Sequence, residues 1–431
     1  MKNPESGERS PEEGASPTAA ETLVPDVGER SNHPSPAGGP RPENARPGGR
    51  RRKRRRGRKV FARAPDATAR QPELDAAPPF SAPAPPIAPQ PSPPRFRSDP
   101  VFAALDLGTN NCRLLVAAPG RPGQFRVVDA FSRIVRLGEG LSASGRLGEA
   151  AMDRAVDALR ICADKLRARP IRRSRLIATE ACRAAGNGAE FLARVERETG
   201  IALQIIDRRT EARLAVSGCG SLVERDTAGV VLFDIGGGSS EVALVDLSRH
   251  RTPRLAEHIV AWTSLPVGVV SLAERFGGRD VSRDTFAAMV SEVVGHLEKF
   301  EGRTRLDSVR HGTRFHLLGT SGTVTTLAGV HLGLERYDRR RVDGLWMDRA
   351  SVDAMVEKLV GWDFAERVAN PCIGPDRADL VLAGCAILEA IRKVWPAERL
   401  RVADRGLREG ILTELMAEEG VWRRPRPDDR R

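Results

Sequence analysis

Apolar and polar positions along the chain predict a mixed α/β protein that begins near residue 101. Short apolar runs, many of them ending in Gly or Asp, are typical of buried strands. Strands are predicted at 101–107, 112–118, 125–135, 175–179, 203–206, 229–235, 242–245 and 314–318. Apolar residues at helical spacing predict helices at 148–168, 188–199, 210–222, 281–300, 324–332, 349–360 and 376–394. The amphipathic helices at 281–300, 349–360 and 376–394 are expected to serve core packing or a dimer interface.

Two segments of this pattern are copies of one another. Leu105-Asp-Leu-Gly-Thr-Asn aligns with Phe233-Asp-Ile-Gly-Gly-Gly, and an apolar strand follows each. The duplicated strand–turn–strand unit predicts two similar α/β lobes that each place a tight hairpin at the mouth of a shared cleft. The lobes are expected over 99–228 and 229–431.

The turn in each copy has the composition of an anion site. Glycine and small residues let the backbone approach a ligand closely, and successive free N–H groups form an anion-binding concavity. The Asp at the strand end is suited to a divalent cation, held directly or through water. The pair of turns therefore predicts a phosphate chain with Mg²⁺ between them, although a single Asp-x-Gly turn is commonly an ordinary hairpin.

A third Gly/Ser/Thr loop, Gly319-Thr320-Ser321-Gly322-Thr323, stands between a predicted strand and a predicted helix. Free N–H groups at a helix N-terminus bind anions, which predicts a third phosphate contact here. An ordinary Ser/Thr helix cap is the competing interpretation.

Composition changes the picture at the N-terminus. The chain has 431 residues, and 69 Lys+Arg against 57 Asp+Glu give a net charge of +12. Residues 1–98 are rich in proline and poor in aromatic residues, so they are predicted to be a disordered tail. Nine of the ten residues at 50–59 are basic. This block is expected either to tether polyanions such as RNA, DNA or polyphosphate, or to be a charged tail without a specific partner.

Several classes of protein do not fit the sequence. The six cysteines form no C-x-x-C motif and no Cys/His cluster with zinc spacing. The polar N-terminus is unlike a signal peptide, and no apolar run is long enough to span a bilayer. A reducing cytoplasm is therefore the expected location.

Separated motifs, taken in order, resemble the exopolyphosphatase/guanosine pentaphosphate phosphohydrolase family. The segments that carry the resemblance are Ala104-Leu-Asp-Leu-Gly-Thr-Asn-Asn-Cys-Arg-Leu, Ala178-Thr-Glu-Ala-Cys-Arg, Phe233-Asp-Ile-Gly-Gly-Gly-Ser-Ser-Glu, Leu265-Pro-Val-Gly-Val-Val-Ser-Leu, Leu318-Gly-Thr-Ser-Gly-Thr and Val402-Ala-Asp-Arg-Gly-Leu-Arg-Glu-Gly. The resemblance implies two actin-like (ribonuclease H-like) lobes of the actin/sugar-kinase/Hsp70 type with the active site in the cleft between them. It covers roughly 101–416 and is closest to the short, two-lobed members.

The resemblance also implies roles for individual residues. It makes Glu211 the general base, with Thr210 in place of a further family glutamate, and it makes Glu241 a supporting carboxylate. It implies a Mg²⁺ site at Asp234, to which the pairing of the turns adds Asp106. The expected phosphate-binding residues are Gly108, Thr109, Asn110, Asn111, Arg113, Arg183, Gly236, Gly237, Gly238, Ser239, Gly319, Thr320, Ser321 and Gly322. Glu180 and Arg213 are expected to act in structure rather than in catalysis.

The leading functional hypothesis is a Mg²⁺-dependent exopolyphosphatase that releases orthophosphate from chain ends. The runner-up within the same reaction class removes the 5′-terminal phosphate of guanosine pentaphosphate. Two further hypotheses are a phosphotransferase of the same superfold and a non-catalytic binder of polyphosphate or alarmone. The resemblance is compatible with a homodimer.

Overall fold

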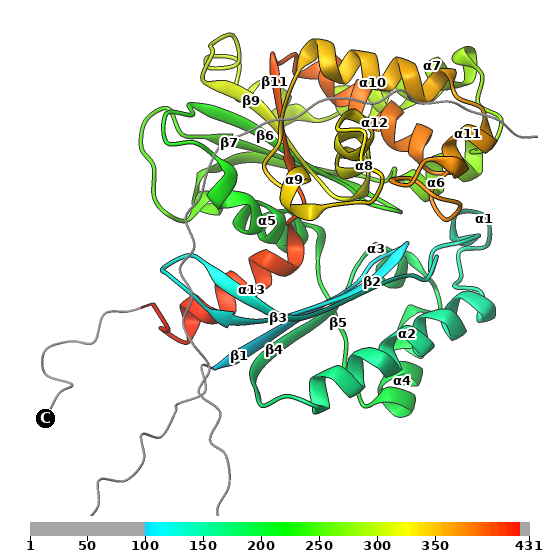
Figure 1. Ribbon diagram of the computed structural model, residues 1–431, viewed down its shortest axis with the longest axis vertical. Coiled ribbons are helices and arrows are strands. Elements are labelled where there is room, and N and C mark those ends of the chain that lie inside the picture. Colours follow the sequence, from blue (N-terminus) through cyan, green and yellow to red (C-terminus); the bar gives the residue numbers. More distant parts are fainter. Residues whose placement is uncertain (1–99, 423–431) are drawn as a thin grey trace, which may run out of the picture. The chain divides into compact units, whose positions relative to one another are not determined.

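The computed structural model describes residues 100–422, which form two mixed β-sheets flanked by helices (Figure 1). The predicted tail at 1–98 and its basic block at 50–59 lie outside the described residues. Among residues 100–422, no helix combines the length and the apolar character needed to cross a bilayer.

The first sheet has five strands in the order β3-β2-β1-β4-β5. Their bounds are β1 (Val101–Leu107), β2 (Asn111–Pro119), β3 (Phe125–Ile134), β4 (Ile171–Ala178) and β5 (Gln204–Ile205). The connecting helices are α1 (Leu141–Ser144), α2 (Glu149–Arg167), α3 (Glu180–Ala184) and α4 (Gly188–Thr199). Ala103, Leu105 and Leu107 of β1 face a core formed with α2 and α4.

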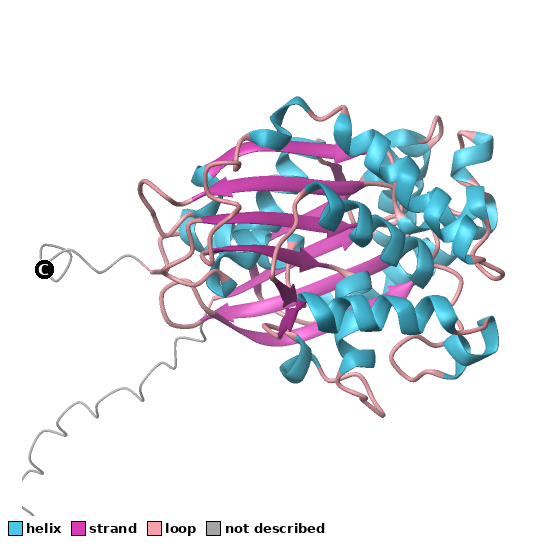
Figure 2. Ribbon diagram, turned by 90° about the horizontal axis from the view of Figure 1, so that it is seen from above, coloured by secondary structure: helices cyan, strands magenta, loops and turns pink. Residues whose placement is uncertain are grey.

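The second sheet has six strands in the order β10-β11-β9-β6-β7-β8. Their bounds are β6 (Gly229–Ile235), β7 (Ser240–Asp246), β8 (Ile259–Leu265), β9 (Phe315–Thr320), β10 (Trp346–Asp348) and β11 (Arg399–Ala403). The helices that follow or precede these strands are α6 (Val269–Phe276), α7 (Arg283–Glu298), α8 (Gly322–His331), α9 (Arg339–Val342), α10 (Arg349–Gly361), α11 (Phe364–Ala369) and α12 (Val381–Val394). Short 3₁₀ segments occur at η1 (Gly220–Leu222), η2 (Leu255–His258) and η3 (Glu301–Thr304). Figure 2 shows the strands from above, with helices lying over and around them.

Two helices lie between the sheets, α5 (Arg208–Cys219) and α13 (Leu407–Glu418) (Figure 1). Phe102 and Ala104, which point to the other face of β1, pack with Ile411 and Leu415 of α13. Ala215 and other residues of α5 pack on the second sheet instead. Because β1 and β6 are covered on both faces, each is apolar at nearly every position, as the sequence shows.

The predicted elements are confirmed, with differences at their ends. Strand 101–107, helix 188–199 and strand 229–235 have the predicted bounds. Strand β4 begins at Ile171 rather than 175, because it pairs with β1 from Val101 and Phe102 onward. Its Arg172 and Arg173 make this segment look polar and form ion pairs with Glu419 and Glu418. Helix α12 begins at Val381 rather than 376, since turns occupy residues 371–380.

The fold prediction of two actin-like α/β lobes is also confirmed: each Asp-x-Gly hairpin is the antiparallel pair that begins a sheet, β1–β2 in one and β6–β7 in the other. The second sheet begins with β6 at Gly229, and α13, from the C-terminal part of the chain, packs on the first sheet.

Candidate active site

The two hairpin turns have the same hydrogen bond at the same place. The amide of Gly108 donates to the Asn111 carbonyl at 2.9 Å, and the amide of Gly236 donates to the Ser239 carbonyl at 2.9 Å. A carbon atom at the Cβ position of Gly236 would lie 2.7 Å from that Ser239 oxygen, so a side chain there would break the turn. The repeat read from the sequence is therefore a repeat of backbone geometry.

The turns also pack against each other across the cleft. A Cβ on Gly237 would lie 2.9 Å from the Thr109 Cβ, and a Cβ on Gly238 would lie 2.9 Å from the Thr109 Oγ1. Glycine is needed at both positions because the facing turn occupies the space of a side chain. The duplicated turns thus meet in one site, as their sequence predicts.

The carbonyl groups of each turn are held from behind. Val135 and Arg136 donate their amides to the Asn110 carbonyl at 2.9 and 3.1 Å, and Gly138 donates to Thr109 at 2.9 Å. In the second turn, the amides of Val269 and Val270 at the start of α6 bind the Gly236 and Gly237 carbonyls.

In both turns, backbone amides on the side of the cleft remain free to donate hydrogen bonds. Within residues 100–422, the amides of Thr109, Asn110, Gly237 and Gly238 donate no hydrogen bond. All four residues line the cleft. Unpaired amides in successive positions form an anion-binding concavity, and two such concavities face one another here.

The four predicted carboxyl groups line the same cleft: those of Asp106, Asp234, Glu211 and Glu241. Asp106 lies opposite Arg113 in the β1–β2 ladder, and Asp234 lies opposite Glu241 in the β6–β7 ladder. Glu211 comes from the first turn of α5.

Burial dominates the electrostatics of these acids. Desolvation and the neighbouring Asp106 carboxyl raise the pKa of Asp234 to about 6. Desolvation and Asp234 raise the pKa of Glu241 to about 7, against two hydrogen bonds that its Oε1 accepts from Ser239 Oγ at 2.7 Å and Ser264 Oγ at 2.8 Å. Burial likewise raises the pKa of Asp106, whose Oδ1 has no hydrogen-bond partner among the described residues.

Glu211 is held by Arg183. The Arg183 Nη2 donates to Glu211 Oε2 at 3.1 Å, its Nε to Glu180 Oε2 at 3.0 Å and its Nη1 to the Ile206 carbonyl at 2.6 Å. Burial, with a further contribution from Glu241, raises the pKa of Glu211 well above its usual value despite this arginine.

Glu180 is the first residue of α3 and joins two arginines. One of its oxygens accepts from Arg183, and the other accepts from Arg208 at 2.7 Å. Glu180 therefore fixes the arginine that fixes Glu211.

Thr210 is part of the cap of α5. Its amide donates to Asp207 Oδ1 at 2.7 Å, and its hydroxyl lies 3.0 Å from Asp207 Oδ2. The threonine that replaces the family glutamate therefore fixes the start of the helix that carries Glu211.

The third loop reaches the cleft at the N-terminus of α8. Thr320, Ser321, Gly322 and Thr323 line it, but two hydroxyls are already engaged: Thr320 Oγ1 donates to the Arg405 carbonyl and Ser321 Oγ donates to the Ile235 carbonyl, both at 2.6 Å. Ser321 has a left-handed φ of 79°. The loop therefore offers backbone amides rather than these hydroxyls.

Two predicted residues do not line the cleft. Gly319 is buried beneath it, where a Cβ would lie 2.6 Å from Phe233 Cζ and 2.6 Å from Val324 Cγ1. Arg183 lies behind Glu211, with its guanidinium occupied by protein partners. The other predicted site residues line one cleft.

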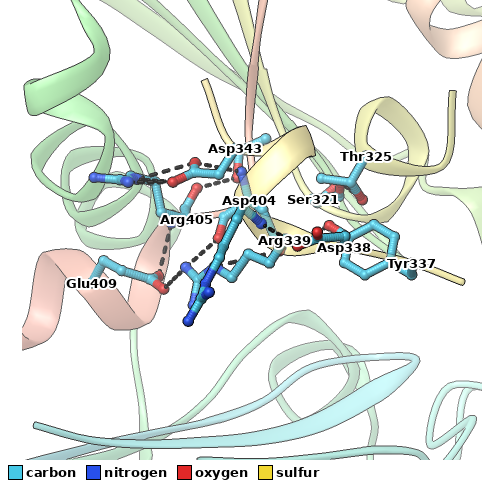
Figure 3. A network of polar contacts seen from close by, with 12 residues as sticks. Ser321, Thr325, Tyr337, Asp338, Arg339, Asp343, Asp404, Arg405 and Glu409 are labelled. Atoms are coloured by element: carbon cyan, nitrogen blue, oxygen red, sulfur yellow. Dashed lines mark hydrogen bonds and ion pairs between the residues drawn. The ribbon is translucent and has the colours of Figure 1, made fainter. Parts of the chain in front are cut away.

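The β11–α13 turn forms a further wall of the cleft, for which the sequence predicted no site residue. Asp404, Arg405, Arg408 and Glu409 line it. Figure 3 shows the network that holds this turn: Arg405 binds Asp343, Arg339 binds Glu409 at 2.9 Å, and the Tyr337 hydroxyl donates to Asp404 at 2.8 Å. The motif at 402–410 was the available signal, but it does not tell which side chains face the cleft.

Two of the arginines that line the cleft, Arg113 and Arg408, lie near each other and remain available to a ligand. Within residues 100–422, the guanidinium groups of Arg113 and Arg408 form no hydrogen bond or ion pair, and both residues line the cleft. Burial lowers the pKa of Arg408, and the nearby Arg113 adds to that effect. An anion between the two guanidinium groups would relieve their repulsion.

Comparison with known proteins identifies the family to which the chain belongs. The model of the Ppx/GppA phosphatase family matches residues 116–419. The chain belongs to this family.

Members of the Ppx/GppA family with curated names are similar over most of the described residues. Exopolyphosphatase 2 of Mycobacterium tuberculosis is 29% identical over 326 residues, which is 73% of this chain and 98% of the relative. The guanosine-5′-triphosphate,3′-diphosphate pyrophosphatase of Aeromonas salmonicida is 29% identical over 74% of this chain and 60% of its own length. The crystal structure of the Aquifex aeolicus Ppx/GppA family member is similar with a TM-score of 0.59 and 26% identity, over 74% of this chain and 98% of that one.

Proposed function

We propose that the protein is an exopolyphosphatase, which hydrolyses the terminal phosphoanhydride bond of inorganic polyphosphate and releases orthophosphate. The observation that supports it best is the pair of facing turns, whose unpaired amides lie in the same cleft as Asp106, Asp234, Glu211 and Glu241. The names of curated relatives, exopolyphosphatase among them, support the same reaction class.

The cleft residues divide the work of the reaction. The amides of the two turns and of α8 bind the terminal phosphates, and Arg113 and Arg408 pair with their oxygens, since guanidinium groups bind phosphate in a bidentate way. Glu211 accepts a proton from the attacking water while the water oxygen bonds to the terminal phosphorus. The bridging P–O bond breaks, and the shortened chain leaves with the electron pair. A buried carboxylate with a raised pKa is suited to this role.

Arg183 acts on Glu211 rather than on the phosphate. Its hydrogen bonds to Glu211, to Glu180 and to the Ile206 carbonyl fix the direction of the Glu211 carboxylate.

The residues also fit Mg²⁺. Among the described residues, no group of three or more His, Cys, Asp or Glu side chains is placed to hold a metal by itself. Mg²⁺ in phosphoryl-transfer sites commonly uses one or two carboxylates together with substrate phosphates and water. Asp106, with its unpartnered Oδ1, and Asp234 would hold the ion in that way. When bound, Mg²⁺ supplies charge neutralisation at the phosphate oxygens.

Hydrolysis of guanosine pentaphosphate at its 5′-terminal phosphate is the second candidate. The similarity to the Aeromonas pyrophosphatase favours it, and the same cleft would hold the same terminal phosphates.

A phosphate-release assay tests the proposal. Wild-type protein is compared on long-chain polyphosphate, guanosine pentaphosphate and ATP at equal concentration, with and without Mg²⁺. Polyphosphate is expected to be the best substrate; faster release from guanosine pentaphosphate would favour the second candidate. Transfer of phosphate to an acceptor would indicate a kinase, and binding without release would indicate a binding protein.

The assay includes Glu211→Gln. Since it removes the general base, this variant is expected to lose about 10²–10⁴ in kcat while it still binds polyphosphate. Glu196→Gln, at an exposed position of α4, is the matched control and keeps wild-type activity. Turnover by Glu211→Gln at the control rate would refute the assigned base.

A further inference from the structure

A second hollow adjoins the cleft at the edge of the first sheet. Its lining is Asn111, Ser132, Arg133, Ile134, Arg136, Arg154, Asp376 and Arg377. Asn111 and Arg377 line the cleft as well, so the two hollows meet at these side chains. The segment 135–136 is hydrogen-bonded to the Asn110 carbonyl, which ties the hollow directly to the first phosphate turn.

The lining is strongly basic, with four arginines and one aspartate. Two of the arginines are already bound. Arg136 donates to both oxygens of Asp379, at 2.9 and 3.0 Å, and Arg154 donates to the Val135 carbonyl at 2.9 Å and to Glu139 at 2.7 Å.

The other two arginines are not engaged in this way. Within residues 100–422, the guanidinium groups of Arg133 and Arg377 form no hydrogen bond and no ion pair; Arg133 lies 5.5 Å from the centre of the Phe131 ring. Arg377 is at the junction with the cleft, and Arg133 is exposed on the edge strand β3. These groups offer bidentate phosphate contacts in sequence outward from the cleft.

The chemistry of the lining separates two kinds of substrate. A site for a guanosine moiety needs apolar or aromatic surface for the base. This lining has one apolar side chain, Ile134, and no aromatic one. A linear polyphosphate carries negative charge along its whole length, and a row of arginines beyond the reacting end matches that chain.

We propose that this arginine-lined hollow binds the phosphate units of a long polyphosphate chain that follow those held in the cleft, which makes the protein selective for long chains. The proposal rests on the proposed hydrolysis of polyphosphate and adds a subsite to it. The subsite is composed of β3, α2 and the 376–377 turn, so a bound chain contacts residues of both lobes.

Arg133 is the residue to change, since it lines the hollow but not the cleft. In the full-length protein, Arg133→Glu is expected to raise KM for long-chain polyphosphate about tenfold, because attraction becomes repulsion. The KM for tripolyphosphate is expected to change much less, and kcat for both stays at the wild-type value. Arg133→Lys keeps the charge and is expected to recover part of the loss. Arg126→Glu, an equal charge reversal at an exposed position on the same strand, leaves both KM values unchanged.

Three outcomes would overturn the subsite: KM unchanged for both substrates, KM raised equally for both, or a rise confined to guanosine pentaphosphate, which would place a nucleoside in the hollow. If wild-type protein hydrolyses none of these substrates, the proposed function fails instead. The dissociation constant for long-chain polyphosphate, measured without Mg²⁺ for wild type and Arg133→Glu, then still tests the subsite: a weaker Arg133→Glu complex supports it and equal constants refute it. The basic block at 50–59 is present in every variant, so the comparison holds it constant.

Discussion

Single polar residues of the cleft are buried at positions that cost stability in the ligand-free fold. Glu241 is 4% exposed, and the side-chain oxygens Asn110 Oδ1 and Asn111 Oδ1 are buried without a partner among the described residues. Buried polar groups without hydrogen bonds cost stability. Their concentration around one cleft is expected of a site whose geometry serves binding rather than the stability of the ligand-free fold.

The burial of the Glu241 carboxyl group makes the stability of the fold depend on pH. The pKa of Glu241 is raised to about 7 by burial and Asp234, so the folded state holds this proton more tightly than the unfolded chain does. The contribution of Glu241 to stability is therefore greatest below its unfolded pKa and is lost as pH rises through about 7. Glu241→Gln keeps the acceptor for Ser239 and Ser264 but does not titrate.

Without divalent cations, wild-type protein is expected to lose more stability than Glu241→Gln between about pH 5 and about pH 8, by on the order of 3 kcal/mol. Thermal unfolding at the two pH values measures the difference. Glu196→Gln is expected to keep the wild-type dependence. Parallel loss of Tm in Glu241→Gln and wild type would show that Glu241 is ionised in the folded state across this range.

Among the elements, the crossing of α5 and α13 positions both Glu211 and the 404–409 turn. The helices approach so closely that a Cβ on Gly218 would lie 1.9 Å from the Gly406 carbonyl oxygen, and one on Gly410 would lie 2.0 Å from the Leu214 carbonyl oxygen. The obstructing atoms belong to the backbone, so no side chain can turn away to make room.

Gly218→Ala is therefore expected to destabilise the fold by about 1–3 kcal/mol or more and to raise KM, since the helices must separate and the turn beside the cleft moves with α13. Thermal unfolding and phosphate release measure the two effects. Gly295→Ala in α7 is the control: nothing lies within 4 Å of its Cβ position, so the substitution is expected to be neutral or stabilising. Equal Tm values for both variants would mean that the crossing tolerates a wider spacing.

Across the described molecule as a whole, polar contacts join the two lobes. Arg136 follows the first sheet and pairs with Asp379 before α12, and the Gly140 amide donates to Glu274 Oε1 at 2.8 Å. The Arg136 and Asp379 side chains are 30% and 27% exposed, so the ion pair is partly screened by solvent.

Arg136→Gln is expected to raise KM for tripolyphosphate a few-fold, because affinity falls with the fraction of molecules whose cleft is closed. Steady-state kinetics measure KM, and small-angle scattering measures whether the ligand-free protein expands. Arg160→Gln removes ion pairs within the first lobe only and is expected to change neither. A wild-type KM for Arg136→Gln would exclude this pair as a determinant of closure.

Much of the fold can be predicted because its signals are local. A strand covered on both faces is apolar at nearly every position, so 101–107 and 229–235 can be located from their own residues. Prediction is weaker where distant residues supply the partner: the arginines of β4 make the segment look like a loop, and its backbone pairing with β1 makes it a strand.

The candidate site divides in the same way. The two Asp-x-Gly turns, and the correspondence between them, follow from the amino-acid order alone, because the conformation of a four-residue turn depends mainly on the residues within it. Three other features arise only when the chain is packed: the pairing of Arg183 with Glu211, the burial of Gly319 beneath the cleft, and the wall formed by 404–409. The partner of a side chain depends on which distant segments the packed helices and sheets bring beside it, and no local pattern contains that information.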